Sequence, residues 1–117
     1  MKENIVKDKS FKFAVRVINL YKFLCNDKKE YVLSKQVLRS GTSIGSNIEE
    51  ADGGITMSDY SKKISMAYKE AKETNYWIRL LWETDYIDSK IFNSLRKDCD
   101  ELCKLLFSIL KTTRINK

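Results

Sequence analysis

The chain contains no histidine and no proline among its 117 residues, and it has only four glycines. Without histidine it lacks the side chain that most often acts as a general acid or base near neutral pH. The missing proline and the scarce glycine leave few turn signals for a β-sandwich or a barrel. These absences favour long helices and argue against an enzyme.

Long apolar runs are also missing. No stretch approaches the roughly 18 apolar residues of a membrane-spanning helix, and the first residues lack the apolar core of a signal peptide. Three cysteines, an odd number, are typical of a reducing compartment. Cys99 and Cys103 lie four residues apart, but only Cys25 could join them, so we predict packing thiols rather than a zinc site. We expect a cytoplasmic protein without cofactor, metal or membrane partner.

The net charge of +6 is unevenly distributed. Residues 40–61 carry four acids and no base, whereas the segments on either side are strongly basic. Such a surface suits a polyanion such as nucleic acid, although many soluble domains are as basic for solubility alone. Glu49, Glu50 and Asp52 could bind a metal through carboxylates, but a solvated acidic helix end is the simpler interpretation.

Apolar residues recur at helical spacing along the whole chain and predict four helices, at about 8–26, 32–52, 57–84 and 88–113. In the fourth helix we expect Phe92, Cys103, Phe107 and Leu110 to broaden the core stripe. Short polar connections favour an antiparallel up-and-down four-helix bundle, an all-α single domain over residues 1–117. The predicted helix ends depend on local signals. We expect Ser10 to cap the first helix, Gly53 to adopt a left-handed conformation, Thr56 or Ser58 to cap the third helix, and Asp88 to cap the fourth.

The first predicted helix has two apolar faces. The remaining strip of polar residues is narrow, which is typical of a helix with neighbours on two sides. We therefore expect one face in the core and the other at a subunit interface. The two faces comprise Phe11, Ala14, Val15, Ile18, Tyr21 and Cys25 on one side and Phe13, Val17, Leu20 and Leu24 on the other.

The second predicted helix has small and polar residues from Arg39 to Ala51, although its apolar stripe continues through this segment. Glycine costs about 1 kcal/mol relative to alanine inside a helix, so close packing must compensate. Either a helix or a ligand could approach closely here. Ala67 and Ala71 of the third helix are small partners for this segment, which favours a helix-packing contact over a ligand site.

The third predicted helix has bases on one face, together with Ser65 and Glu83, at alternating spacings of three and four residues. These bases could contact phosphates, and Tyr76 could stack on an unpaired base; the alternative is a solvated face. The same basic surface could extend to the first helix, through Lys9, Lys12 and Arg16, and to the second helix, through Lys35 and Arg39. The candidate nucleic-acid-binding residues are Lys12, Arg16, Lys62, Lys69, Lys72, Tyr76 and Arg79.

Two further features of the third helix concern packing. Glu73 lies beside the alanine-lined face, and Arg39 is its candidate partner if it is partly buried. Trp77, Trp82, Tyr76 and Tyr86 form an aromatic cluster near the end of this helix. We expect these rings to pack in the core or in an interface between copies of the chain.

The pattern resembles a bacterial four-helix-bundle family, the proteins encoded within intervening sequences of the large-subunit ribosomal RNA gene. It is also similar to the accessory protein of diversity-generating retroelements. The resemblance extends from Phe11 to Phe107. Its motifs are Phe11-x-x-Ala14, Gln36-x-x-Arg39-Ser40-x-x-Ser43-Ile44-x-x-Asn47-Ile48-x-Glu50, Tyr60, and Ala67-x-x-Glu70-x-x-Glu73.

The resemblance implies a protomer of a homopentameric ring with a basic surface. For the retroelement relatives it implies nucleic-acid binding and association with a reverse transcriptase; for the ribosomal-insert branch it implies no established activity. Two positions depart from the family pattern: Ala51 follows Glu50 where a glycine is common, and Glu70 replaces a small hydroxyl residue.

Together these observations predict a non-enzymatic homo-oligomeric bundle that assembles through the wide apolar faces of the first and third helices and binds RNA or DNA through a basic surface. The alternative is a protein-interaction scaffold for which nucleic acid is irrelevant. The motif residues Arg39, Ser40, Ser43, Asn47, Glu50 and Glu73 are expected to be structural.

Overall fold

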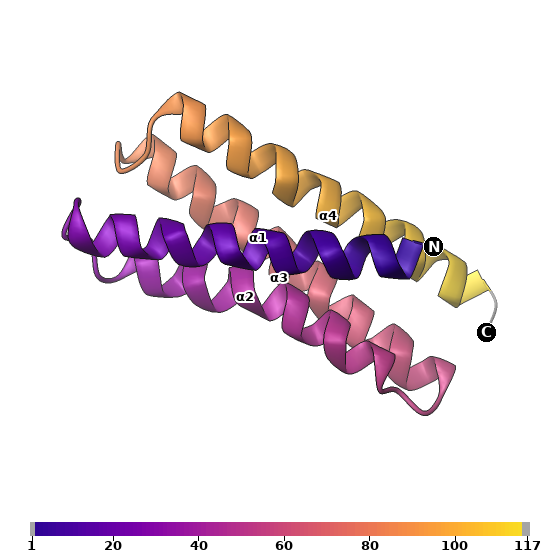
Figure 1. The fold of residues 1–117 in the computed structure, drawn as a ribbon. Coiled ribbons are helices and arrows are strands. Elements are labelled where there is room, and N and C mark those ends of the chain that lie inside the picture. Colours follow the sequence, from indigo (N-terminus) through magenta and orange to yellow (C-terminus); the bar gives the residue numbers. More distant parts are fainter. Residues whose placement is uncertain (1, 116–117) are drawn as a thin grey trace.

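The computed structural model describes the backbone of residues 2–115 and the side chains of residues 4–113. It contains four α-helices and, within the described residues, no strand, so the predicted all-α class is confirmed. Figure 1 shows them as long rods joined by short loops. The helices are α1 (Lys2–Asn26), α2 (Leu33–Asp52), α3 (Met57–Glu83) and α4 (Ser89–Ile115).

Each helix packs against two neighbours. α2 contacts α1 and α3, and α4 contacts α3 and α1, while α1 and α3 lie diagonally opposite, with no two of their described Cα atoms within 8 Å. Lys7, early in α1, pairs with Asp52 at the end of α2. Ser61, early in α3, lies against Thr113 late in α4, with their hydroxyl oxygens 3.4 Å apart. The side-chain contacts thus join residues that are far apart in the sequence.

The core contains the predicted stripes of all four helices. The inner face of α1 is the one that includes Phe13 and Val17, and the stripe of α3 is buried from Ile64 to Leu81. One assignment in α4 is wrong. Phe107 was expected to broaden the core stripe, but 53% of its surface is exposed because it lies at the outer edge of the α3–α4 contact.

Two predicted helix ends differ in the structure. α1 begins at Lys2 rather than near residue 8, because Val6 packs into the core, and the Ser10 hydroxyl donates to the Lys7 carbonyl within the helix instead of capping it. Gly53 has φ of −85° and is not left-handed. Its N–H and that of Gly54 donate to the carbonyls three residues earlier, which ends α2 in a tight turn.

The beginning of α2 is capped by Glu30, a residue that the sequence placed in a plain polar turn. Its carboxylate accepts hydrogen bonds from the backbone N–H groups of Val32, Leu33 and Ser34, at 3.2, 3.0 and 2.7 Å. Burial by itself would raise the pKa of Glu30, but these three donors outweigh it and lower the pKa. The carboxylate thus satisfies N–H groups that a helix start leaves unpaired.

The other two predicted caps are confirmed. The Thr56 hydroxyl accepts from the N–H of Asp59 at 3.0 Å at the start of α3. The Asp88 carboxylate accepts from the N–H of Ile91 at 2.8 Å at the start of α4. Both contacts have the ordinary geometry of an N-cap.

The small residues of α2 separate into two contacts. A Cβ on Gly41 would lie 2.7 Å from both methyls of Val17, so α1 is packed directly against this glycine. On the neighbouring side of α2, the buried Thr74 hydroxyl donates to Ser40 at 2.8 Å. Gly41 thus faces α1, and the hydroxyl pair joins α2 to α3 on the stripe of α3 that also contains the buried Ala67 and Ala71.

Candidate nucleic-acid interface

Four exposed bases form the outward side of α3. We call Lys62, Lys69, Lys72 and Arg79 the basic strip. None of the four forms an ion pair with another residue in the described part of the chain, so their charges are available to a ligand. Tyr76 lies among them, half exposed, with its ring edge against Trp77.

The two candidate bases of α1 have different surroundings. The Arg16 guanidinium donates to Asp98 at 2.6 Å and to the Ser94 hydroxyl at 2.9 Å, which ties α1 to α4. Lys12 forms an exposed pair with Asp8 one turn away. Because α1 and α3 lie diagonally opposite, these bases are separated from the basic strip by the neighbouring helices.

Arg39 of α2 links two carboxylates of α3. Its guanidinium donates to Glu70 at 3.2 Å and to Glu73, and the Trp77 indole N–H also donates to Glu73, at 2.9 Å. The suggested pairing of Arg39 with Glu73 is therefore present, with Glu70 as a second acceptor. All three charged side chains keep contact with solvent, so the cluster orients α2 against α3 rather than contributing a large stability term.

The remaining motif residues make contacts within the fold. The Ser43 hydroxyl donates to the Arg39 carbonyl at 2.6 Å, and the amide of the buried Asn47 donates to the Ser43 carbonyl at 2.9 Å. Glu50 pairs with Lys63 of α3 at 2.6 Å. These partners belong to α2 and α3.

The acidic end of α2 is neutralised by lysines. Lys7 of α1 lies 2.6 Å from Asp52 and 3.6 Å from Glu49, and the hydrogen bond to Asp52 is the main reason that the pKa of Lys7 is raised. Within the described residues, no cluster of three acidic or cysteine side chains has a geometry that could hold a metal ion. The carboxylate metal site considered above therefore has no support from the geometry.

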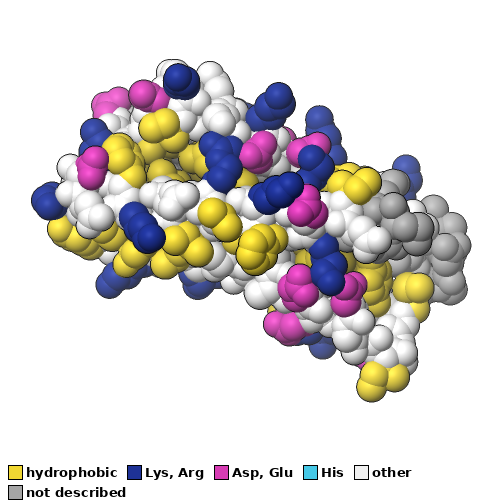
Figure 2. Space-filling model, viewed as in Figure 1, with side chains coloured by type: hydrophobic (Ala, Val, Ile, Leu, Met, Phe, Trp, Pro, Cys, Tyr) yellow, Lys and Arg dark blue, Asp and Glu magenta, His cyan; other side chains and the backbone are white. Residues whose placement is uncertain are grey.

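The outer face of α1 remains apolar and exposed. Phe11, Val15 and Ile18 are 68%, 46% and 39% exposed, at spacings of one helical turn. Beside Phe11 is a hollow of about 220 Å³ between α1 and α2, whose walls include Thr42 and Gly45. Figure 2 shows hydrophobic side chains gathered in patches on the visible face of the molecule, between scattered acids and bases.

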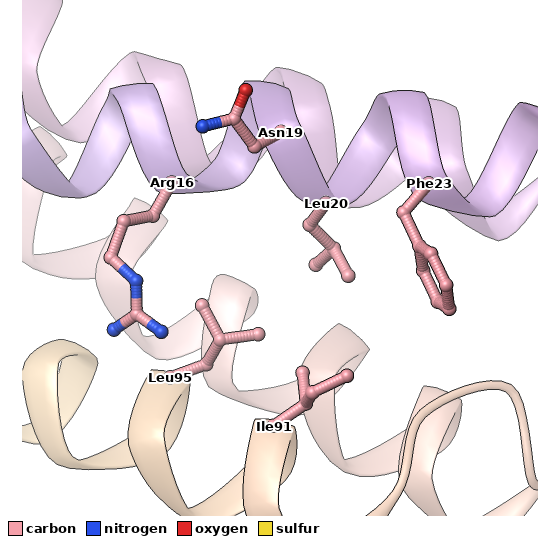
Figure 3. A pocket seen from close by; sticks show the side chains of 6 residues that line it. All are labelled: Arg16, Asn19, Leu20, Phe23, Ile91 and Leu95. Atoms are coloured by element: carbon pink, nitrogen blue, oxygen red, sulfur yellow. The ribbon is translucent and has the colours of Figure 1, made fainter.

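A second hollow lies between α1 and α4. In Figure 3 Leu20 and Phe23 of α1 and Ile91 and Leu95 of α4 point toward one another, and Arg16 closes one end. The volume is about 250 Å³. Of the four neighbouring pairs, α1 and α4 are the least closely packed, which explains why their apolar residues leave a groove.

Sequence reasoning missed a cleft between α3 and α4. We call it the Phe107 cleft; it has a volume of about 400 Å³. The only sequence signal is that Lys104 and Phe107, one turn apart, lie at the edge of the apolar stripe of α4. The lining residues are Tyr68, Lys72, Asp100, Cys103, Lys104 and Phe107.

The cysteines are free thiols. Cys99 is fully buried and donates to the Ala71 carbonyl at 3.3 Å; the adjacent Cys103 thiol and burial together raise the pKa of Cys99. Interaction with the adjacent Cys99 thiol, against the opposing effect of burial, lowers the pKa of Cys103, and the nearby Lys72 charge contributes. Cys103 and Cys25 are only partly buried.

Comparison with known proteins agrees with this architecture. The family model described as 23S rRNA-intervening sequence protein matches residues 2–108. The chain belongs to this family. No curated protein matches it.

A solved structure supports this family assignment. It is a protein of unknown function from the S23 ribosomal protein family of Bacteroides thetaiotaomicron, 55% identical, with a TM-score of 0.94. The match covers 95% of this chain and 99% of that one. Within the described residues, no helix is both long and apolar enough to cross a membrane.

Proposed function

We propose that this family member is a non-enzymatic, homo-oligomeric helical bundle that binds RNA or another nucleic acid through the basic strip of α3. The observation that carries the proposal is the contrast in pairing. Lys62, Lys69, Lys72 and Arg79 are exposed without an ion pair to another described residue, whereas Arg16 and Arg39 are engaged in contacts between helices. Unpaired bases on one helix face are the electrostatic requirement for phosphate binding.

We further propose that the protomer is an antiparallel up-and-down bundle that assembles through the outer face of α1 into a ring, for which the family resemblance suggests five copies. The exposed Phe11, Val15 and Ile18 provide the apolar area, and the hollow beside Phe11 can accept a side chain of a neighbouring copy. A ring would repeat the basic strip around one assembly, which strengthens weak individual contacts. We place the protein in the cytoplasm, where free thiols persist.

The test is fluorescence anisotropy with a labelled RNA at two salt concentrations, about 50 and 200 mM. We expect Lys69→Glu with Lys72→Glu to lower the affinity at least about tenfold and to reduce the salt slope by about 2. The matched control is Lys28→Glu with Lys29→Glu, which changes the net charge equally but in the exposed loop between α1 and α2.

Two results would contradict the proposal: a wild-type protein that binds neither RNA nor DNA at low salt, or equal losses from both charge reversals. In that case the exposed apolar face of α1 would favour the alternative, a scaffold that recruits a polypeptide. A reverse-transcriptase partner, implied by the retroelement resemblance, stays a prediction.

A further inference from the structure

The Phe107 cleft combines an exposed aromatic ring with two lysines. Phe107 is half exposed, and Tyr68 contacts it with ring centroids 6.0 Å apart and planes tilted by 44°. Lys72 of α3 and Lys104 of α4 line the same cleft from its two walls. An exposed aromatic ring in a cleft that two lysines also line is an arrangement typical of a site for a planar anionic ligand.

The single acid in the cleft is already engaged. Asp100 accepts from the Asn75 amide at 2.8 Å and lies 3.5 Å from the Arg96 guanidinium. Lys72 and Lys104 form no ion pair with any described residue. The cleft therefore presents two uncompensated positive charges beside an apolar surface.

The cleft also adjoins the basic strip, because Lys72 belongs to both. A strand whose phosphates follow Lys69 and Lys72 along α3 passes the mouth of the cleft and can turn a base into it. A duplex cannot do so, since its bases are paired and stacked inside the helix. The geometry favours a single strand over a duplex at this position.

We propose that the Phe107 cleft binds one unpaired nucleobase, which stacks on Phe107 while Lys72 and Lys104 contact the adjacent phosphates. The proposal rests on the proposed nucleic-acid binding and assigns it a class of ligand, single-stranded RNA or DNA. A second copy of the chain is disfavoured as occupant, because joining two such clefts would bring four ammonium groups together.

The experiment compares a labelled oligouridine 12-mer and an oligothymidine 12-mer with an RNA duplex of equal length, using the full-length protein. Phe107→Leu keeps the apolar volume and helix propensity but removes the ring. We expect it to weaken binding of the single strands about 5-fold to 100-fold, the range of base–aromatic stacking, and to leave duplex binding unchanged. The matched control is Tyr31→Leu, which removes an equally exposed ring in the loop between α1 and α2 and should have no effect on either.

Cys103 provides a second readout inside the cleft. Its alkylation by N-ethylmaleimide, measured by mass spectrometry, should slow when oligouridine is bound, while alkylation of Cys25, on α1, should not change. Polyglutamate at equal charge should give no protection. The alkylation rates thus report whether the Phe107 cleft is occupied, independently of the measured binding affinities.

The outcomes separate the two proposals. If single strands and duplex bind but Phe107→Leu has no effect and Cys103 is not protected, the base site is wrong and the basic strip remains. Protection by polyglutamate, a loss with Tyr31→Leu instead, or a changed oligomer mass for Phe107→Leu would also overturn the base site. If no oligonucleotide binds, the proposed function itself fails, and the base site fails with it.

Discussion

The outer faces of α1 and α3 differ, although the two helices have equivalent positions in the bundle. Both lie between α2 and α4 and both bury a complete apolar stripe. Outside, however, α1 exposes Phe11 and Val15, whereas α3 exposes the basic strip. The fold thus determines the inward residues of both helices and leaves the outward residues free, which is where a difference in function can be located.

The inward contacts with α2 also differ in kind. Between α1 and α2, the Val17 side chain packs closely on Gly41. Between α3 and α2, the buried Thr74 hydroxyl forms a hydrogen bond with Ser40. Neither contact requires the residues on the outer faces. The comparison therefore predicts that assembly, stability and nucleic-acid binding can be changed separately.

The largest expected effect is on assembly. Phe11→Asp with Val15→Asp places two charges on the outer face of α1, and burying them at an apolar interface is prohibitively costly. We expect light scattering to show a monomer of 13.7 kDa in place of the oligomer, with unchanged helical circular dichroism. The matched control, Met66→Asp with Tyr76→Asp, makes equivalent changes at two exposed positions of α3 and should keep the oligomer mass. Two results would refute the assignment of assembly to α1: a wild-type protein that is already monomeric, or an oligomer that dissociates when the two α3 substitutions are made.

The next effect concerns the inner contact of α1. Gly41→Ala forces a Cβ to within 2.7 Å of the Val17 methyls, and overpacking of this kind costs about 1 to 3 kcal/mol. Gly45→Ala is the control, because its Cβ would lie 3.5 Å from the nearest atom and alanine improves helix propensity by about 1 kcal/mol.

We therefore expect urea unfolding to separate the two variants by about 2 kcal/mol, with Gly45→Ala the more stable. Equal stabilities would show that the backbone of α1 moves away easily and that the close contact is not a constraint.

The smallest expected effect concerns α2, the helix that both α1 and α3 contact. Glu30→Ala removes the carboxylate that caps α2, which should cost about 1 kcal/mol at neutral pH. Asp27→Ala, an exposed change in the same loop, is the control and should have little effect. Because α2 contacts both α1 and α3, neither outer face should be affected more than the other.

The pH dependence of this effect has a defined sign. The folded-state pKa of Glu30 is lowered, so the carboxylate stabilises the fold above the ordinary glutamate pKa of about 4.3 and loses this contribution as the pH falls through the folded value. The stabilities of wild type and Glu30→Ala should therefore converge on acidification. A difference that is constant with pH would show that the ionised form has no special role.

The helices and their buried faces could be predicted because apolar spacing is a local property of the sequence. The starts of α3 and α4 followed from Thr56 and Asp88 for the same reason. The cap by Glu30 could not be predicted, since a glutamate reaching forward over its own turn has no distinctive spacing. The exposure of Phe107 depends on the rotation of α4 against α3, which a stripe of apolar residues does not specify within one position.

The contact between Val17 and Gly41 has a consequence for the evolution of related chains. The two positions share a fixed volume, because a side chain at position 41 would occupy the space of the Val17 methyls. Natural homologues with alanine or serine at position 41 are therefore expected to have a smaller residue at position 17. Side-chain sizes at these positions should co-vary inversely across the family, although they are 24 residues apart in the sequence.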